Sequence, residues 1–272
     1  MQKVVPNFWA DAVGEDIVGY YQQVLGDAAV TCAAHVRYPA GPRIGGTLLV
    51  DLEFYGYRVT FINGGPQFRP NPSLSLHLRL PSGAREVAQS LSAEGRVLME
   101  FGEYPFAAEY AWVEDKFGVS WQVFGAAADN GVQPCLMLCG EAQGRGTEAA
   151  TFYTGALPDA AVGDLVPTSS GELLYGTIEI AGEPIALMDS GVPQDFSFST
   201  GASLLLNAHG QAELDAMWEA LSDVPAAEQC GWLVDRFGLS WQVVPDNLAE
   251  LMERPDAYDK LMAMKKIQIA DF

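Results

Sequence analysis

The sequence has few basic residues and few cysteines. The first shortage excludes some classes of partner, and the second excludes a disulfide-stabilised fold. Only 15 Lys and Arg stand against 35 Asp and Glu, which gives a formal net charge of −20. Nucleic acids and anionic membranes bind proteins through basic surfaces, so we expect neither as a partner. Four cysteines in 272 residues make no disulfide framework. Cys135 and Cys139, four residues apart, fit either a metal pair or two buried free thiols, and we favour the thiols.

Long apolar runs are also absent. No stretch approaches the ~18 apolar residues of a membrane-spanning helix, and residues 1–6 lack the apolar segment of a secretory signal. We therefore expect a cytoplasmic protein. Hydrophobic residues make up 49% of the chain and charged residues 18%, a globular composition, and 272 residues suit two cores. Residues 1–126 carry 13 acids and 9 bases, whereas residues 127–272 carry 22 acids and 6 bases. This asymmetry indicates either a solvated acidic surface, which we favour, or attraction of a cationic ligand.

Two similar nonapeptides reveal an internal duplication. Residues 115–123 read DKFGVSWQV and residues 235–243 read DRFGLSWQV, so seven of nine positions are identical at an offset of 120. Trp112 and Trp232 keep the same offset. Solenoid repeats are much shorter, at ~20 to 50 residues, so a period of this length indicates two copies of a domain.

Each copy shows the pattern of two small units of strands around a helix. In the first copy one helix carries apolar residues at helical spacing, Ile17, Tyr20, Tyr21, Val24 and Leu25, and stops at Gly26. Leucines alternate with Ser75, His77 and Arg79 at the period of a strand with one buried face. We expect strands near residues 4–9, 29–34, 47–55, 57–63, 74–80, 97–100, 110–114 and 120–124, with the second helix at 85–91. In the second copy, Leu214, Met217, Trp218 and Leu221 mark a helix packed on the core.

A C-terminal extension follows Val244 and has no counterpart in the first copy. We expect Asp246 to cap a short helix, followed after Pro255 by another helical turn around Leu261. This tail should pack across a domain or subunit boundary, and a homodimer through it is one expectation.

These residues resemble a known family. The resemblance is carried by residues 61–66 (FINGGP), 73–76, 115–123, 230–245 and 262–269. They are similar to the PhnB-like, or 3-demethylubiquinone-9 3-methyltransferase-type, family of the vicinal oxygen chelate (glyoxalase/bleomycin-resistance) superfamily. The resemblance implies an α+β fold of tandem βαβββ modules, with two glyoxalase/bleomycin-resistance-like domains at 1–126 and 132–245, a helical tail at 246–272, and a pseudo-twofold between the copies. Each copy is expected to wrap its own cleft.

The resemblance also allows a test for a metal site. Metal-dependent members of the superfamily hold a divalent ion with His and Glu from the first, fourth, fifth and last strands of a cleft. This chain offers Ser75 and Ser203 on the fifth strands, and Gln122 and Gln242 on the last. The first and fourth strands offer no His, Asp or Glu at these positions. We therefore expect no metal and no other cofactor.

Polar and aromatic side chains remain as candidates for ligand binding. Period-two geometry places Ser120 and Gln122 on one face of their strand, with Trp121 on the other. His77 shares a face with Ser75 and is either a ligand-binding or a structural histidine. The first cleft is expected to use Phe8, Trp9, Asn63, Ser75, His77, Ser120 and Gln122. The second is expected to use Asp189, Ser203 and Gln242.

Three functional hypotheses follow. The first is a metal-free protein that binds an unknown small organic ligand, with the cleft of residues 1–126 preferred. The second is an enzyme, either a lyase, isomerase or dioxygenase of the superfamily or the methyltransferase of the family label. The sequence does not establish catalysis. A cofactor-binding glycine loop leads into a helix, but no helix is expected after Gly41–Gly46, and no Gly-x-Ser-x-Gly motif is present. The third is an acidic scaffold for a protein partner.

Overall fold

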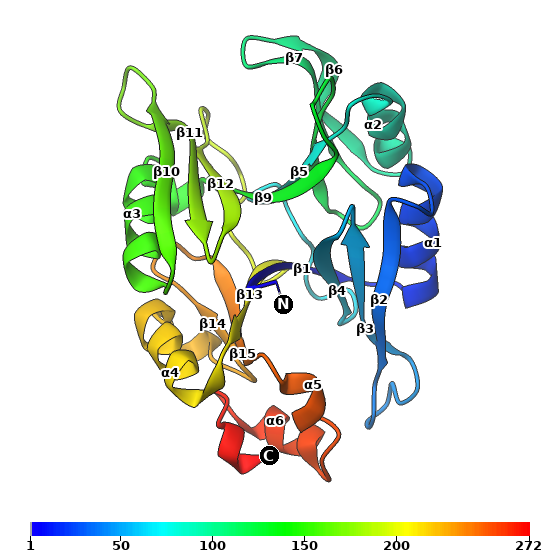
Figure 1. The fold of residues 1–272 in the computed structure, drawn as a ribbon, viewed down its shortest axis with the longest axis vertical. Helices are drawn as coiled ribbons and strands as arrows, with labels where there is room; N and C mark the ends of the chain where they lie inside the picture. The colour runs from blue at the N-terminus through cyan, green and yellow to red at the C-terminus, as the bar shows by residue number, and fades with distance from the viewer. Residues whose placement is uncertain (1) are drawn as a thin grey trace.

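The computed structural model describes residues 2–272 and contains two curved mixed sheets that lie back to back (Figure 1). Sheet A has seven strands in the order β14-β15-β13-β1-β4-β3-β2. Sheet B has eight, in the order β10-β11-β12-β9-β5-β8-β7-β6. No helix within residues 2–272 has both the length and the apolar character needed to cross a bilayer. Helices and mixed sheets alternate along the chain, so the expected α+β class is confirmed.

The elements of the first copy lie close to the positions expected from the sequence. They are β1 (Val4–Ala10), α1 (Gly14–Leu25), β2 (Val30–Arg37), β3 (Thr47–Phe54), β4 (Tyr57–Asn63), β5 (Leu74–Arg79), α2 (Ala84–Ser92), β6 (Arg96–Tyr104), β7 (Ala107–Glu114) and β8 (Ser120–Phe124). The second copy and tail contain β9 (Gly131–Leu138), α3 (Gly146–Ala156), β10 (Ala160–Pro167), β11 (Leu173–Ile180), β12 (Glu183–Asp189), β13 (Ala202–Ala208), α4 (Gly210–Leu221), β14 (Trp232–Val234), β15 (Ser240–Pro245), α5 (Leu248–Leu251) and α6 (Ala257–Ala263).

Each sheet takes strands from both copies, four and three in sheet A and four and four in sheet B. Sheet A joins the first half of copy one to the second half of copy two, because β1 runs antiparallel to β13 with Pro6 opposite Leu204. Sheet B joins the remaining halves through β5 and β9, with Leu76 opposite Pro134. The expectation that each copy wraps its own cleft is therefore wrong. The boundaries of the two copies, at 1–126 and 132–245, and of the tail, at 246–272, remain a prediction from the sequence repeat.

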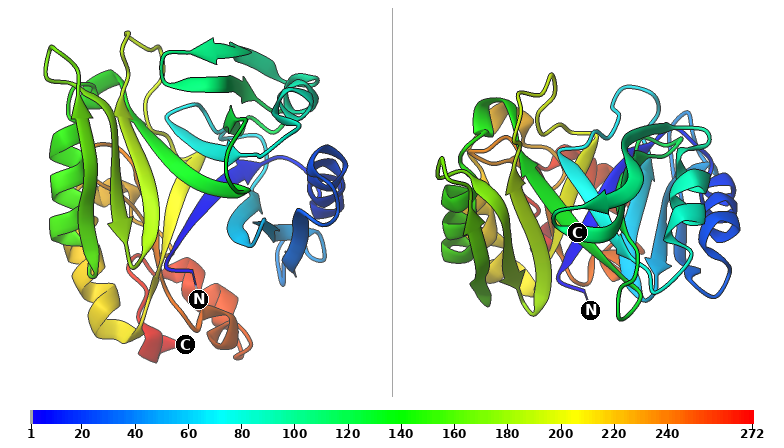
Figure 2. Two further views of the ribbon diagram at one scale, coloured as in Figure 1. Left: turned by 45° about the horizontal axis from the view of Figure 1, so that its top comes forward. Right: turned by 90° about the horizontal axis from the view of Figure 1, so that it is seen from above.

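The two copies nevertheless occupy equivalent positions. Trp121 on β8 lies beside Leu76 of β5, and Trp241 on β15 lies beside Leu204 of β13, in the same parallel register. The four main helices pack against the apolar faces of the sheets, with α1 next to α2 and α3 next to α4 (Figure 2). This arrangement is the pseudo-twofold implied by the repeat.

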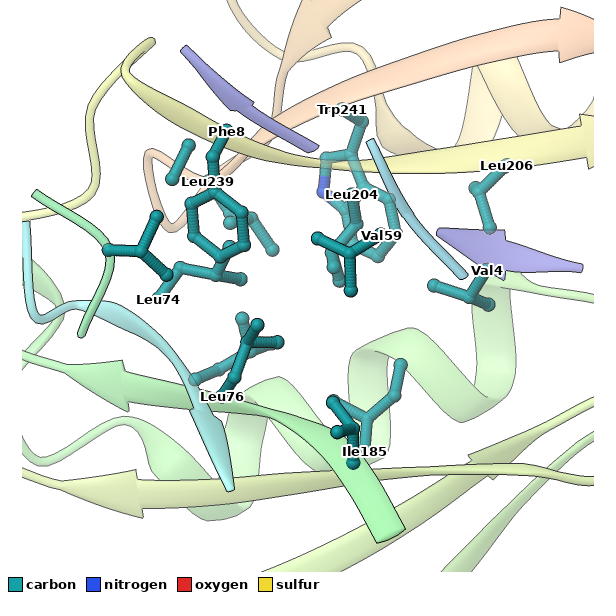
Figure 3. Close-up of a cluster of buried hydrophobic side chains, with 14 of the residues drawn as sticks. Val4, Phe8, Val59, Leu74, Leu76, Ile185, Leu204, Leu206, Leu239 and Trp241 are labelled. Carbon is teal, nitrogen blue, oxygen red and sulfur yellow. The ribbon is translucent and has the colours of Figure 1, made fainter. Parts of the chain in front are cut away.

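The apolar faces of the two sheets meet in the core (Figure 3). Val4, Phe8 and Leu204 of sheet A are fully buried there, together with Leu74 and Leu76 of sheet B. Phe8 was expected to form a wall of the ligand cleft, and that expectation is wrong. Alternation along β1 turns Phe8 into the core and its neighbours Asn7 and Trp9 to the opposite face.

The C-terminal tail packs against its own chain. The backbone amides of Cys230 and Gly231 donate to the carbonyls of Met264 and Lys265. This contact lies where copy two has no long strand equivalent to β6. Lys266 pairs with Asp215 of α4 at 2.7 Å. Asp246 was expected to cap α5, and that expectation is wrong. Asn247 holds the N-cap position, and its side chain makes no capping hydrogen bond.

Candidate functional site

One face of sheet B carries a row of buried polar side chains. We call it the helix-free face, because it lies opposite to the face covered by α2 and α3. The strand register places Ser75 beside Ser120 and Cys135, and His77 beside Gln122 and Gln133. The side chains of adjacent paired residues point to the same side of a sheet. Ser75, His77, Ser120 and Gln122, all predicted for one site, are thus brought together.

Hydrogen bonds connect this row. The amide nitrogen of Gln122 donates to Ser75 Oγ at 2.9 Å, and its Oε1 accepts from the hydroxyl of Tyr110 at 2.9 Å. Trp112 Nε1 donates to Ser120 Oγ at 2.6 Å. All of these groups except the half-buried Trp112 are buried, so their bonds hold the side chains in fixed orientations.

Aromatic rings surround the polar row. The ring of His77 lies 5.1 Å from that of Phe124, edge to face, and 6.4 Å from the nearly parallel ring of Tyr175. Tyr110 contacts Phe124 at 5.0 Å between ring centroids. Burial raises the pKa of the Tyr110 hydroxyl, which therefore stays protonated. The site thus combines fixed uncharged polar groups with aromatic walls, a combination typical of small-molecule sites.

His77 is the one member of the row with an unsatisfied atom. Its side chain is 5% exposed, and its Nε2 has no hydrogen-bond partner among residues 2–272. Burial, and to a smaller extent the charge of Arg79, lower its pKa to about 3, although Gln122 acts in the opposite direction. The imidazole is therefore neutral at physiological pH, with one nitrogen unpaired.

The buried cysteines are free thiols. Cys135 lies beside Ser75 on the helix-free face, and burial raises its pKa to about 12. Cys139 is also buried, and burial raises its pKa to about 11. Both stay protonated near neutral pH, so neither has the thiolate character of a nucleophile.

The remaining candidates of the first cleft lie on sheet A. Trp9 on β1 donates from Nε1 to the carbonyl of Gly65 at 2.7 Å. The carbonyl of Asn63, at the end of β4, accepts from Tyr38 and Arg43. Ser75, His77, Ser120 and Gln122 lie on sheet B instead, so the structure divides the predicted first site between two sheets. Ser203 and Gln242, predicted for the second site, also lie on sheet A. The reason is the exchange of halves between the copies.

The helix-free face of sheet A repeats part of the pattern. Gln242 Nε2 donates to Ser203 Oγ at 3.0 Å, as Gln122 does to Ser75. Leu205, however, takes the position beside Gln242 that His77 takes beside Gln122. Asp51 pairs with Arg58 and accepts from Thr60 at 2.5 Å on the same face. The two faces therefore offer different chemistry to a ligand.

Asp189 anchors the start of α3. Its Oδ1 accepts from the backbone amides of Gly144 and Gly146 at 2.9 and 3.0 Å, and its Oδ2 accepts from Leu173 at 2.7 Å. These bonds account for a carboxylate that is only 5% exposed. Asp189, predicted for the second cleft, has a structural role here.

The repeated nonapeptides likewise contain a structural carboxylate. Asp115 Oδ2 accepts from the Tyr21 hydroxyl at 2.7 Å and from Trp121 Nε1 at 2.8 Å, and Oδ1 accepts from two backbone amides of the turn. Asp235 makes the same set of bonds in copy two, with Tyr153 and Trp241. Burial raises the pKa of Asp115 to about 6, and the hydrogen bonds counteract part of that shift. The motif thus joins the helix to the last strand, while its Ser120 and Gln122 lie on the helix-free face.

The donor set does not fit a divalent metal. The superfamily positions on the helix-free face of sheet B hold Cys135, Ala186, Ser75 and Gln122. On sheet A they hold Asn7, Thr60, Ser203 and Gln242. Neither set contains an imidazole or a carboxylate, the ligands such ions require. Within residues 2–272, no three His, Cys, Asp or Glu side chains cluster as a metal site.

A cavity of about 510 Å³ lies away from both faces, among loops of the second copy. Its lining includes Cys139, Glu141, Arg145, Asp223 and Phe237. The Arg145 guanidinium is already paired with Glu148 and lies over the Phe237 ring. The cavity contains none of the predicted site residues.

Comparison with known proteins identifies the family. The family model described as 3-demethylubiquinone-9 3-methyltransferase matches residues 2–124 and again residues 130–244. The chain belongs to this family. A search of curated proteins gives no match.

Solved structures support the fold of this family member. Glyoxalase I from Zea mays is similar over 93% of this chain and 96% of its own, with 14% identity and a TM-score of 0.60. A PhnB protein from Bacillus cereus is 25% identical over 46% of this chain and 100% of its own, with a TM-score of 0.41. At 14% identity, the likeness to glyoxalase I concerns the fold alone.

Sequence reasoning missed several residues of the helix-free face. Tyr110 and Trp112 lie on β7, which pairs with β8 so that Trp112 is opposite Gln122, and knowledge of this pairing would have found them. Cys135, Gln133 and Tyr175 belong to the other copy, and no local pattern assigns them to this site.

Proposed function

We propose that the protein binds a small organic ligand, without a metal, at the helix-free face of sheet B. The observation that carries the proposal is the neutral, buried His77 with an unpaired nitrogen, at the end of the hydrogen-bonded row of Ser75, Gln122 and Tyr110. An unsatisfied buried polar atom costs about 1–3 kcal/mol. A ligand that pairs with it recovers this cost on binding.

Packing alone does not account for the row. Tyr110 and Cys135 are buried but lie outside the core cluster between the sheets. The face has no covering helix, and Tyr175 on its wall remains 39% exposed. These features support a surface that receives a ligand, built from both copies instead of from residues 1–126 alone.

The enzymatic alternatives receive less support. The methyltransferase of the family label would need a cofactor loop, but Gly41–Gly46 connects β2 to β3, two strands of an antiparallel hairpin. A glycine loop that binds such a cofactor leads from a strand into a helix. Asp115, Asp235 and Asp189 have structural partners, and the thiol of Cys135 stays protonated. The face therefore favours binding over acid–base or nucleophilic catalysis.

An NMR screen tests the proposal. Nitrogen-15 labelled protein is mixed with a library of small aromatic and heteroaromatic compounds. We expect binders to shift the resonances of Ser75, His77, Gln122 and Tyr175. Binders that shift only residues of sheet A, or only those of the 510 Å³ cavity, would contradict the proposal.

A further inference from the structure

We infer that the ligand carries an uncharged O–H or N–H donor on an aromatic ring, and that this donor pairs with Nε2 of His77. The inference rests on the proposed binding function and adds the chemical class of the ligand. Phenols are the simplest members of this class.

The polarity of the unpaired nitrogen follows from its neighbours. The amide nitrogen of Gln122 donates to Ser75 Oγ, so Oε1 is the atom of Gln122 that can accept a hydrogen bond from the neighbouring imidazole of His77. A neutral imidazole has one N–H and one lone pair. If the N–H points to Gln122 Oε1, Nε2 presents a lone pair. A ligand must therefore bring a donor.

The surroundings select against charge. Burial strongly disfavours the protonated form of His77, and the same desolvation acts on any ion placed beside it. Arg79, the cation whose charge lowers the pKa of His77, already donates to Gln133 Oε1 at 3.1 Å. An anionic ligand would meet no free donor at Nε2, and a cationic one would be poorly solvated.

Aromatic rings continue from His77 to the rim of the sheet. Phe124 contacts Tyr110, and Tyr110 contacts Phe106 at 5.0 Å between centroids. Phe106 is 63% exposed, although large aromatic side chains are normally buried. A planar aromatic ligand would pack against this series of rings through offset or edge contacts.

Tyr175 lies beside the imidazole of His77, with 6.4 Å between the ring centroids. Its ring lies nearly parallel to that of His77 and comes from the other copy. A side chain that is 39% exposed has room to rotate outward. Binding then exchanges a buried, unpaired acceptor for a paired one.

Two probes of matched shape test the inference. 2-Naphthol has the donor, and 2-fluoronaphthalene replaces it with a group that cannot donate. We would measure both affinities by NMR titration for the wild type, His77→Leu and His209→Gln. His209 is an exposed control, and Leu205 shows that this fold accommodates leucine at the position equivalent to residue 77.

The wild type and His209→Gln should bind 2-naphthol about tenfold more tightly than 2-fluoronaphthalene, because one buried hydrogen bond is gained. In His77→Leu the ratio should fall to about one. The nitrogen-15 shift of His77 Nε2 should change with 2-naphthol and not with 2-fluoronaphthalene, which gives a readout independent of the variant.

Different failures are distinguishable. Equal affinities of the two probes at the helix-free face of sheet B would contradict the inference that the ligand donates to His77, and would leave the proposed function standing. A preference for 2-naphthol that persists in His77→Leu would also overturn it. If neither probe binds this face but other compounds of the NMR screen do, the inference fails and the proposed function stands; if no compound of the screen binds it, both fail.

Discussion

His77 on β5 and Leu205 on β13 occupy equivalent positions in the two sheets, each beside the glutamine of the repeated motif. The duplication thus preserves the Ser–Gln hydrogen bond in both sheets but gives only one of them an imidazole. This difference provides matched variants within a single chain.

His77 should make the protein sensitive to acid. Its folded-state pKa lies at about 3, below the usual 6.5, so the stability it contributes is complete above about pH 6.5 and is lost as the pH falls toward 3. We expect His77→Leu to remove about 2 kcal/mol of the stability difference between about pH 7.5 and pH 5. Urea unfolding of the wild type and of His77→Leu at the two pH values measures this. An unchanged pH dependence would contradict a neutral buried His77.

The motif carboxylates should contribute equally in the two copies. Tyr21→Phe removes the hydroxyl that donates to Asp115, and Tyr153→Phe removes its counterpart at Asp235. Each should lower the free energy of unfolding by about 1.5–3 kcal/mol, the cost of one lost buried hydrogen bond to a charged group. Chemical denaturation of the two variants checks the prediction. A neutral effect in either copy would show that its carboxylate does not anchor the helix.

The exchange of halves predicts the behaviour of fragments. Residues 1–126 contain β1–β4 of sheet A and β5–β8 of sheet B, so alone they leave the inner edges of β1 and β5 without their partners β13 and β9. We expect this fragment to self-associate or to remain unfolded, and to form a 1:1 complex with residues 127–272. Size-exclusion chromatography with light scattering decides. A stable, folded monomer of residues 1–126 would contradict the topology.

Metal should neither copurify nor stabilise. The superfamily positions carry Ser, Gln, Thr, Asn, Ala and Cys in place of His and Glu, so a divalent ion finds no suitable ligand set. We expect well under one equivalent of zinc, nickel, iron or manganese in the untagged protein, and no change in Tm with EDTA. About one equivalent of any of these metals would overturn this prediction.

Much of the fold is predictable from the sequence, because amphipathic patterns report which face of an element is buried. The leucines of β5 and the stripe of α1 show this clearly. Strand pairing is not predictable in this way, since alternation identifies a face and not the neighbouring strand. For the same reason, four of the predicted site residues, Ser75, His77, Ser120 and Gln122, meet on one face, while Trp9 and Asn63 lie on the other sheet and Phe8 lies in the core. Tyr175 enters the site only through the pairing of β9 with β5.

Calorimetric titration of Gln122→Ala and Gln242→Ala with a ligand from the NMR screen tests the central claim most directly. The two glutamines make the same bond to serine, but only Gln122 also accepts from Tyr110 and lies beside His77. We predict that Gln122→Ala weakens binding by about 1–3 kcal/mol, whereas Gln242→Ala leaves the affinity nearly unchanged. Equal losses in both variants, or a loss only in Gln242→Ala, would contradict the assignment of the site to sheet B.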